Sequence, residues 1–98
     1  MNRGLIIEPE AEAEIEETSR WYDLQNPGLG SAFLRAVETA LSTIQTNPLQ
    51  YQIVYKQVRR AGLGRFPQGL MYVVSEREII VLGCIHGRRD PRRWQKRV

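Results

Sequence analysis

Cationic side chains supply most of the groups in this sequence that could do chemistry. One set lies in the middle of the chain, and a denser set runs His86-Gly-Arg-Arg-Asp-Pro-Arg-Arg-Trp94. The middle set comprises Lys56, Arg59, Arg60 and Arg65. Arginine recognises phosphate or carboxylate through two parallel hydrogen bonds, and a cluster of arginines can stabilise the charged transition state of RNA cleavage. These residues therefore fit solvated charge, a binding surface for an anionic partner, or a ribonuclease site.

Proton transfer would fall to His86, because it is the only side chain with an unperturbed pKa near neutrality and arginine does not deprotonate at working pH. A structural histidine at a strand end is the alternative. Cys84 lies in an apolar strand pattern, which favours a buried thiol over a nucleophile. With one cysteine and one histidine in the chain, we expect no metal site, and the glycine pairs lack the spacing of a nucleotide-binding loop, so we expect no cofactor.

Acidic residues concentrate in the first half of the chain. Glu10, Glu14 and Glu17 follow one another at spacings of four and three, which predicts a solvated outer stripe on a helix. Residues 1 to 50 hold 3 basic and 8 acidic side chains and residues 51 to 98 hold 11 and 3, so the two halves carry −5 and +8. This separation favours docking of the basic half onto an anionic partner.

Length limits the chain to one domain, which we assign to residues 1–98 with 88–98 as a basic C-terminal tail or short helix. Trp94 is the one residue of that tail expected to reach the core. The N-terminal region is acidic where a signal peptide would be apolar, and no apolar run approaches the roughly 20 residues of a membrane span. We therefore expect a cytoplasmic protein.

Hydrophobic spacing predicts the elements that position these groups. A short apolar strand at 4–7 stops at Pro9, which starts a helix over about 9–24. A turn at 26–30 leads to a second helix that ends before Asn47-Pro48, and the two should form an antiparallel hairpin with Trp21 and Tyr22 in the core.

The second half has the β-branched and aromatic texture of strands. We expect strands at 51–55, 58–66, 70–75 and 79–85, with turns at 66–69 and 75–78. The fold class is thus α+β: an N-terminal strand, an antiparallel helical hairpin, and a three- to four-stranded antiparallel sheet covered by the helices on one face.

In combination, Phe66-Pro-Gln-Gly-Leu-Met-Tyr72 and His86-Gly-Arg-Arg-Asp-Pro91, at this separation and after the helical hairpin, resemble the RelE/ParE superfamily of type II toxin-antitoxin systems. The resemblance covers nearly the whole chain and is strongest to ParE-like members. It implies a toxin that binds an acidic, ParD/RelB-like antitoxin in a hetero-oligomer.

Members of this superfamily act in two ways. ParE-like toxins inhibit DNA gyrase by binding it, which would use Arg88, Arg89, Arg92, Arg93 and Trp94 here. RelE-like toxins cleave mRNA on the ribosome, which would use Arg59, Arg60, Arg65, His86 and Arg89. A third possibility is a non-toxic remnant that only binds antitoxin.

One departure favours the first activity. Nuclease members carry an arginine shortly before the tyrosine of the third strand, whereas this chain has Gly69 ahead of Tyr72. The resemblance therefore predicts a ParE-like plasmid-stabilisation toxin that acts without catalysis, with the ribosome-dependent endoribonuclease as the alternative.

Overall fold

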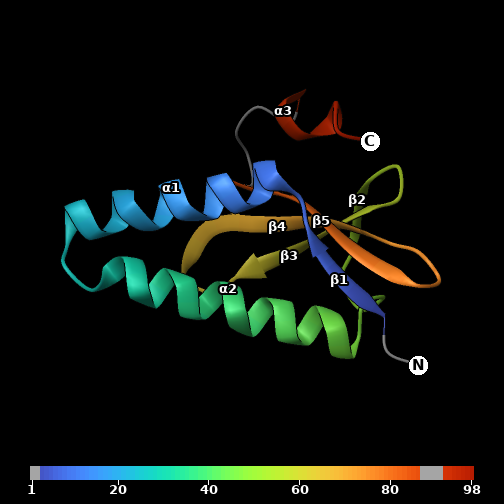
Figure 1. Cartoon of the computed structure of the whole chain (residues 1–98), viewed down its shortest axis with the longest axis horizontal. Helices are drawn as coiled ribbons and strands as arrows, with labels where there is room; N and C mark the ends of the chain where they lie inside the picture. Colours follow the sequence, from blue (N-terminus) through green and yellow to red (C-terminus); the bar gives the residue numbers. More distant parts are fainter. Residues whose placement is uncertain (1–2, 87–91) are drawn as a thin grey trace.

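A helical hairpin packs on one face of a small twisted sheet, and a short C-terminal helix packs on the other (Figure 1). The computed structural model describes residues 3–86 and 92–98. In chain order the elements are β1 (Gly4–Ile7), α1 (Pro9–Gln25), α2 (Leu29–Thr46), β2 (Ile53–Tyr55), β3 (Val58–Leu63), β4 (Phe66–Val74), β5 (Glu78–His86) and α3 (Arg92–Gln95).

The sheet contains five strands in the order β1-β5-β4-β3-β2. Strands β2 to β5 form the predicted antiparallel meander. The α+β class is confirmed, but the sheet is larger and mixed because β1 joins its edge parallel to β5, with Leu5 opposite Ile79. A parallel neighbour needs a long crossover, which the helical hairpin and the meander together provide.

Close approach of α1 and α2 depends on one glycine. A Cβ on Gly30 would lie 2.4 Å from the carbonyl oxygen of Ser19, so a larger residue there would push the helices apart. The Asp23 carboxylate accepts hydrogen bonds from the backbone N–H groups of Gly28 and Gly30, at 3.2 and 2.8 Å. Two otherwise unpaired donors at the start of α2 are thereby satisfied.

The turn between β3 and β4 lies earlier than the sequence predicted. Residues 66–69 belong to β4, and the chain reverses at Gly64-Arg65, where Gly64 has a φ of 62° that favours glycine. Pro67 fits inside the strand because the register shifts next to it, between Gly62 and Leu63 on the neighbouring strand, so its missing N–H does not interrupt a regular ladder. The predicted turn at 66–69 was wrong.

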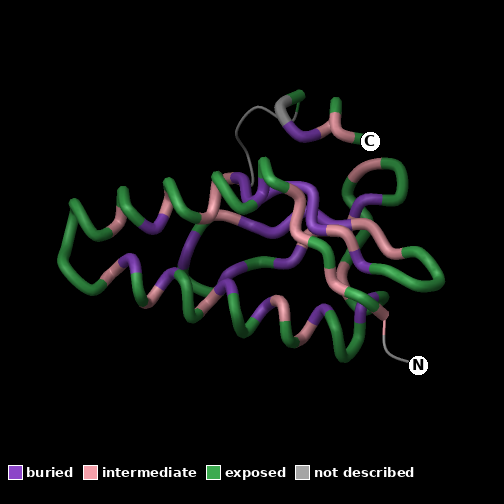
Figure 2. The backbone as a smooth tube through the Cα atoms, viewed as in Figure 1, coloured by how far each residue is buried: buried purple, intermediate pink, exposed green. Residues whose placement is uncertain are grey.

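The sheet has a hydrophobic core on each of its two faces. The larger lies on the hairpin face, defined by Ala61, Leu70, Tyr72 and Val81, which pack against α1 and α2. Figure 2 shows the buried stretches along the central strands and the exposed turn of the hairpin. Of the two aromatics predicted for this core, Tyr22 packs there, whereas Trp21 is 55% exposed, because adjacent residues lie about 100° apart around the helix.

The smaller core lies on the α3 face, defined by Val58, Met71, Leu82 and Ile85. Trp94 of α3 is buried against it and stacks edge-on with Tyr55, with ring centroids 5.6 Å apart. The C-terminal segment is thus held on the sheet through the tryptophan, as the sequence predicted.

Candidate functional site

Arg59 points to the hairpin face, because it lies opposite Tyr72 of the larger core. Its Nη1 donates to the carbonyl oxygens of Leu49 and Tyr51, at 3.0 and 2.6 Å. These bonds fix the loop that leads into β2. Arg59 therefore has a structural role that the sequence did not show.

Tyr72 also contacts the chain between α2 and β2. Its hydroxyl donates to the carbonyl oxygen of Pro48 at 2.6 Å. Burial raises the pKa of Tyr72 to about 12, and the nearby Arg59 charge opposes that rise. The hydroxyl thus remains protonated and anchors the end of α2 to the sheet.

Arg60 points the other way, to the α3 face, because it lies opposite Met71 of the smaller core. Its guanidinium lies directly over Gly69, where an added Cβ would come within 2.6 Å of Cζ. The Nη2 group donates to the Pro67 carbonyl oxygen at 3.1 Å, and Nε is enclosed without an acceptor. A cation thus occupies the space above position 69 although the residue there is glycine.

His86 ends β5 on the hairpin face, opposite Gln68, whose Oε1 accepts a hydrogen bond from the Tyr22 hydroxyl of α1. With Glu17 and Trp21 it lines a surface pocket of about 560 Å³. Arg60 and His86 therefore lie on opposite faces of the sheet.

Arg65 occupies the β3–β4 turn, with its guanidinium carbon 5.1 Å from the centroid of the Phe66 ring. Arg89 lies outside the described residues. Of the five residues predicted for a nuclease site, the four that the structure describes are not brought together.

The residues predicted to contact a target are only partly described. Arg88 and Arg89 lie outside the described residues, as does the side chain of Arg93, and Arg92 is exposed on α3. Trp94 is buried in the smaller core and so is not available to a target in this conformation.

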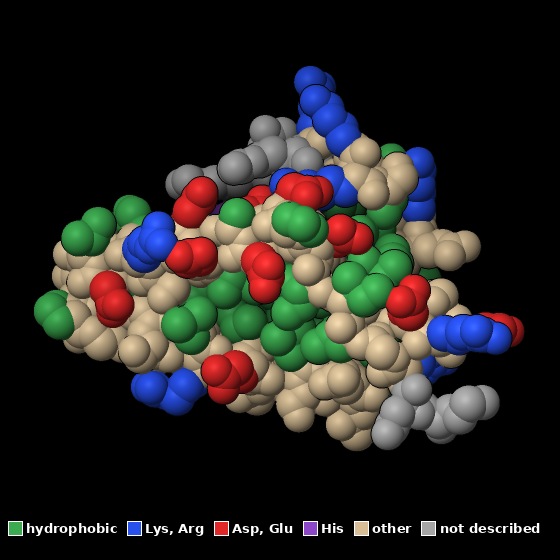
Figure 3. Space-filling model, viewed as in Figure 1, with side chains coloured by type: hydrophobic (Ala, Val, Ile, Leu, Met, Phe, Trp, Pro, Cys, Tyr) green, Lys and Arg blue, Asp and Glu red, His purple; other side chains and the backbone are tan. Residues whose placement is uncertain are grey.

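A groove between α1 and α2 forms an apolar surface on the outer side of the hairpin. It has a volume of about 470 Å³, and its apolar lining residues are Ile7, Ile15, Leu34, Val37 and Leu41. Figure 3 shows apolar side chains gathered between the two helices with acidic side chains around them. Three charged residues of α1 form its rim: Glu12, Glu16 and Arg20. The sequence predicted the two helices but not this groove.

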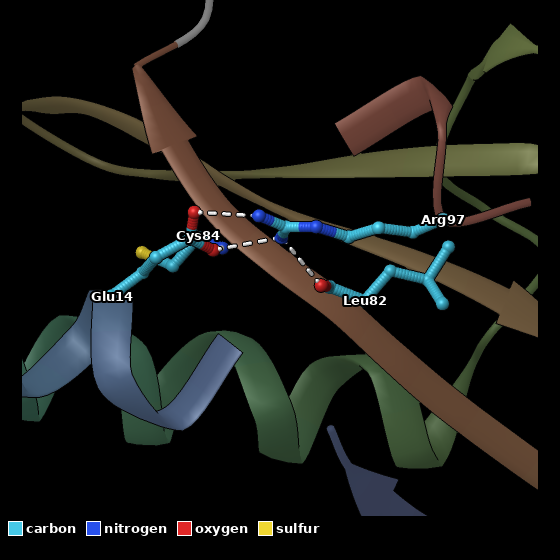
Figure 4. A network of polar contacts seen from close by, with 4 residues as sticks. All are labelled: Glu14, Leu82, Cys84 and Arg97. Atoms are coloured by element: carbon cyan, nitrogen blue, oxygen red, sulfur yellow. Dashed lines mark hydrogen bonds and ion pairs between the residues drawn. The ribbon is translucent and has the colours of Figure 1, made fainter. Parts of the chain in front are cut away.

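A polar network ties the C-terminus to the edge of β5 beyond β1 (Figure 4). Arg97 donates through Nη1 and Nη2 to the two carboxylate oxygens of Glu14, at 3.0 and 3.1 Å. Nη1 also donates to the Leu82 carbonyl oxygen at 2.9 Å, and Glu14 accepts from the Cys84 backbone N–H at 3.1 Å. The prediction that Glu14 belongs to a solvated stripe was wrong.

This arrangement replaces a neighbouring strand. Strand β1 stops at Ile7 opposite Val81, which leaves the next backbone groups of β5 without a strand partner on that side. The side chains of Glu14 and Arg97 supply the missing acceptor and donor. Burial, and less strongly the Glu14 carboxylate, raises the pKa of the Cys84 thiol to about 12, so this thiol is not an activated nucleophile.

Within residues 3–86 and 92–98, no three histidine, cysteine or acidic side chains come close enough to hold a metal ion. None of the helices described is long and apolar enough to cross a membrane.

Solved structures share this fold. The chain is similar to the chromosomal ParDE toxin-antitoxin system of P. aeruginosa, with a TM-score of 0.76 and 18% identity, covering 86% of this chain and 95% of that one. It is also similar to the YoeB dimer of Staphylococcus aureus, with a TM-score of 0.60 and 14% identity over the same shares. No curated protein matches the chain in sequence.

A family profile identifies the class of protein, a toxin of a type II toxin-antitoxin system. The family profile described as the ParE toxin of the type II toxin-antitoxin system parDE matches residues 5–91. The chain belongs to this ParE toxin family.

Proposed function

We propose that this chain is a toxin that arrests growth by binding DNA gyrase or a related type II topoisomerase, without cleaving RNA. The observation that carries this proposal is the separation of Arg60 and His86 by the sheet. Cleavage of an RNA strand needs a group that moves a proton at the same phosphate that a cation stabilises. Among the described residues, the candidate cation and the candidate base face opposite sides.

Arg59 does not restore such a site. It shares the hairpin face with His86, but its register partner Tyr72 and that of His86, Gln68, lie four residues apart on β4. Its Nη1 is already bonded to two backbone carbonyl oxygens. Arg59 therefore supports the fold and lies away from His86 along the sheet.

The surface for the target remains the arginine set predicted from the sequence, Arg88, Arg89, Arg92 and Arg93. The exposed Arg92 is the member whose side chain the structure describes. Since Trp94 is buried, we assign it the role of holding α3 in place beside that set. Gyrase acts on cytoplasmic DNA, so we place the toxin in the cytoplasm as part of a plasmid-stabilisation or related module.

The apolar groove between α1 and α2 is the surface that we assign to the antitoxin. An amphipathic helix binds such a groove by placing apolar residues one turn apart, here against Ile15, Leu34 and Val37. Because Glu12 and Glu16 form the rim, the antitoxin helix should carry basic residues beside its apolar anchors. The acidic residues of the antitoxin, which the family resemblance implies, would then lie against the arginine-rich half of the toxin.

A test in cells separates this proposal from inactivity. Induction of the chain should stop growth and relax a reporter plasmid while pulse-labelled protein synthesis continues. Co-expression of its antitoxin should restore both growth and supercoiling. Normal growth with intact complex formation would instead identify a non-toxic, antitoxin-binding protein.

One observation favours the alternative, a ribosome-dependent endoribonuclease. The guanidinium of Arg60 lies over Gly69, so the cation missing from the sequence at this position is present in space. The alternative predicts codon-phased mRNA cuts in a translation extract that vanish in Arg60→Gln and Arg89→Ala. The charge-matched control Arg35→Gln, on an exposed position of α2, should leave such cuts unchanged. Intact mRNA would count against it.

A further inference from the structure

The Arg60 guanidinium has donors in excess of its partners. A guanidinium carries five N–H donors, and within residues 3–86 and 92–98 that of Arg60 makes one hydrogen bond, from Nη2 to the Pro67 carbonyl oxygen. Its Nε is enclosed and has no acceptor within the described chain. By contrast, Arg59 donates to two carbonyl oxygens, and Arg97 donates to a carboxylate and a carbonyl.

Among the residues that the structure describes, no acidic side chain forms an ion pair with Arg60. The ion pairs of the described residues join Arg20 to Glu16 and Arg97 to Glu14, and neither includes Arg60. A partly buried cation with unpaired donors is expected to find an acceptor, and the chain itself provides none in the described part.

The floor below the guanidinium is backbone. Gly62 of β3 and Gly69 of β4 lie opposite each other on the α3 face. Gly69 is covered by Arg60, and a Cβ there would lie 2.6 Å from both Cζ and Nε. Gly62 is exposed, and a Cβ there would lie 3.9 Å from Nη1. The absence of a side chain at Gly69 therefore makes room on the sheet for the guanidinium, and Gly62 lies beside Nη1.

We propose that Arg60, above Gly62 and Gly69, is a binding site for a carboxylate side chain of a protein partner. A carboxylate is planar, carries one negative charge and accepts two parallel N–H bonds from a guanidinium. Opposite Arg60 and Gly69 lie Met71 and Ile85, which are buried apolar residues. This proposal rests on the proposed function, in which the chain acts by binding other proteins.

The surroundings favour a carboxylate over a nucleic-acid backbone. Binding along a phosphate backbone uses several cations in a row. Arg59 lies on the opposite face of the sheet, and Arg97 is already paired with Glu14. Of the two arginines of β3, Arg60 alone lies on the α3 face, so the strand offers one charge there, which matches one acidic side chain.

Nuclear magnetic resonance can test this on the purified chain. The cross-peak of the Arg60 Nε–Hε group should shift and saturate on titration with sodium acetate. Sodium chloride at equal ionic strength should produce no such shift. Dimethyl phosphate, which has the same charge as acetate and mimics a nucleic-acid backbone, should bind more weakly.

Three variants test whether Arg60 and Gly69 form the site. Arg60→Gln should abolish the response, whereas the charge-matched Arg35→Gln should retain it. Gly69→Ala keeps the charge of Arg60 but forces its guanidinium to move, so acetate binding should weaken about tenfold or more, as expected for losing one charge-assisted hydrogen bond. The urea midpoint of Gly69→Ala, measured beside that of the native chain, separates loss of binding from loss of folding.

Stronger binding of dimethyl phosphate than acetate would overturn the carboxylate assignment and point to a nucleic-acid backbone. No saturable shift with either anion would overturn the site altogether. Because the titration contains no topoisomerase, its outcome is independent of whether the chain inhibits one.

Discussion

Replacing Arg97 with methionine should destabilise the chain far more than the same replacement at Arg20. Arg97→Met keeps an apolar stem of similar reach but removes two hydrogen bonds to Glu14 and one to the Leu82 carbonyl oxygen. Arg20 is also paired with a glutamate of α1, Glu16, and therefore provides the matched control.

Burial sets the size of the expected effect. The side chains of Arg97 and Glu14 are 18% and 13% exposed, whereas those of Arg20 and Glu16 are 72% and 63% exposed. Breaking a fully buried pair costs roughly 3–5 kcal/mol, and an exposed pair contributes about 0–1 kcal/mol. For the partly buried pair we expect Arg97→Met to lower the free energy of unfolding by about 2 kcal/mol. Arg20→Met should lower it by less than about 0.5 kcal/mol.

Urea titration followed by circular dichroism measures both values, and thermal unfolding should show a decrease of roughly 8–16 °C for Arg97→Met. A double-mutant cycle with Glu14→Gln should give a coupling energy of about 1–2 kcal/mol. Equal costs for Arg97→Met and Arg20→Met, or a coupling energy near zero, would refute the view that this pair holds the C-terminus on β5.

Three further predictions concern the two cores. The thiol of Cys84 and the phenol of Tyr72 ionise near 9.0 and 10.0 when unfolded, but folding raises both pKa values to about 12, so the folded state holds these protons more tightly. Stability should therefore be full below about pH 9 and fall as the pH rises towards 12, and a constant urea midpoint up to about pH 11 would contradict this. Tyr72→Phe removes the buried bond to Pro48 and should cost about 1–2 kcal/mol by urea titration; a variant as stable as the native chain would show that the bond contributes nothing. Trp94→Ala should cost about 3 kcal/mol and increase amide exchange in α3, whereas unchanged stability would mean that α3 is not docked in solution.

Local sequence patterns predicted the elements well and their pairing only in part. The spacing of Phe33, Val37, Ala40 and Ile44 predicted α2 because a helix repeats its buried face regardless of what covers it. The parallel pairing of β1 with β5 joins residues more than 70 positions apart, and nothing in the short apolar run of β1 specifies a partner. Register of this kind comes from the tertiary fold.

The candidate site shows the same limit more clearly. The spacing of Glu14 with its neighbours predicted an exposed position, because a helical pattern cannot show that Arg97 returns to it from the C-terminus. In the sequence, Gly69 indicated that a cation was missing at this position. The register of β3 against β4 brings the Arg60 guanidinium over Gly69, and the sequence does not show that register. The sequence shows which residues are charged, but it does not show on which face of the sheet each of them lies.

A direct comparison of two activities in one purified preparation tests the central claim. The chain, freed from its antitoxin, would be added in excess to a gyrase supercoiling reaction and, separately, to a translation extract with a defined mRNA. We predict loss of supercoiling with the mRNA intact. Unchanged supercoiling together with codon-phased cuts in the mRNA would contradict the claim and assign the chain to the nuclease activity.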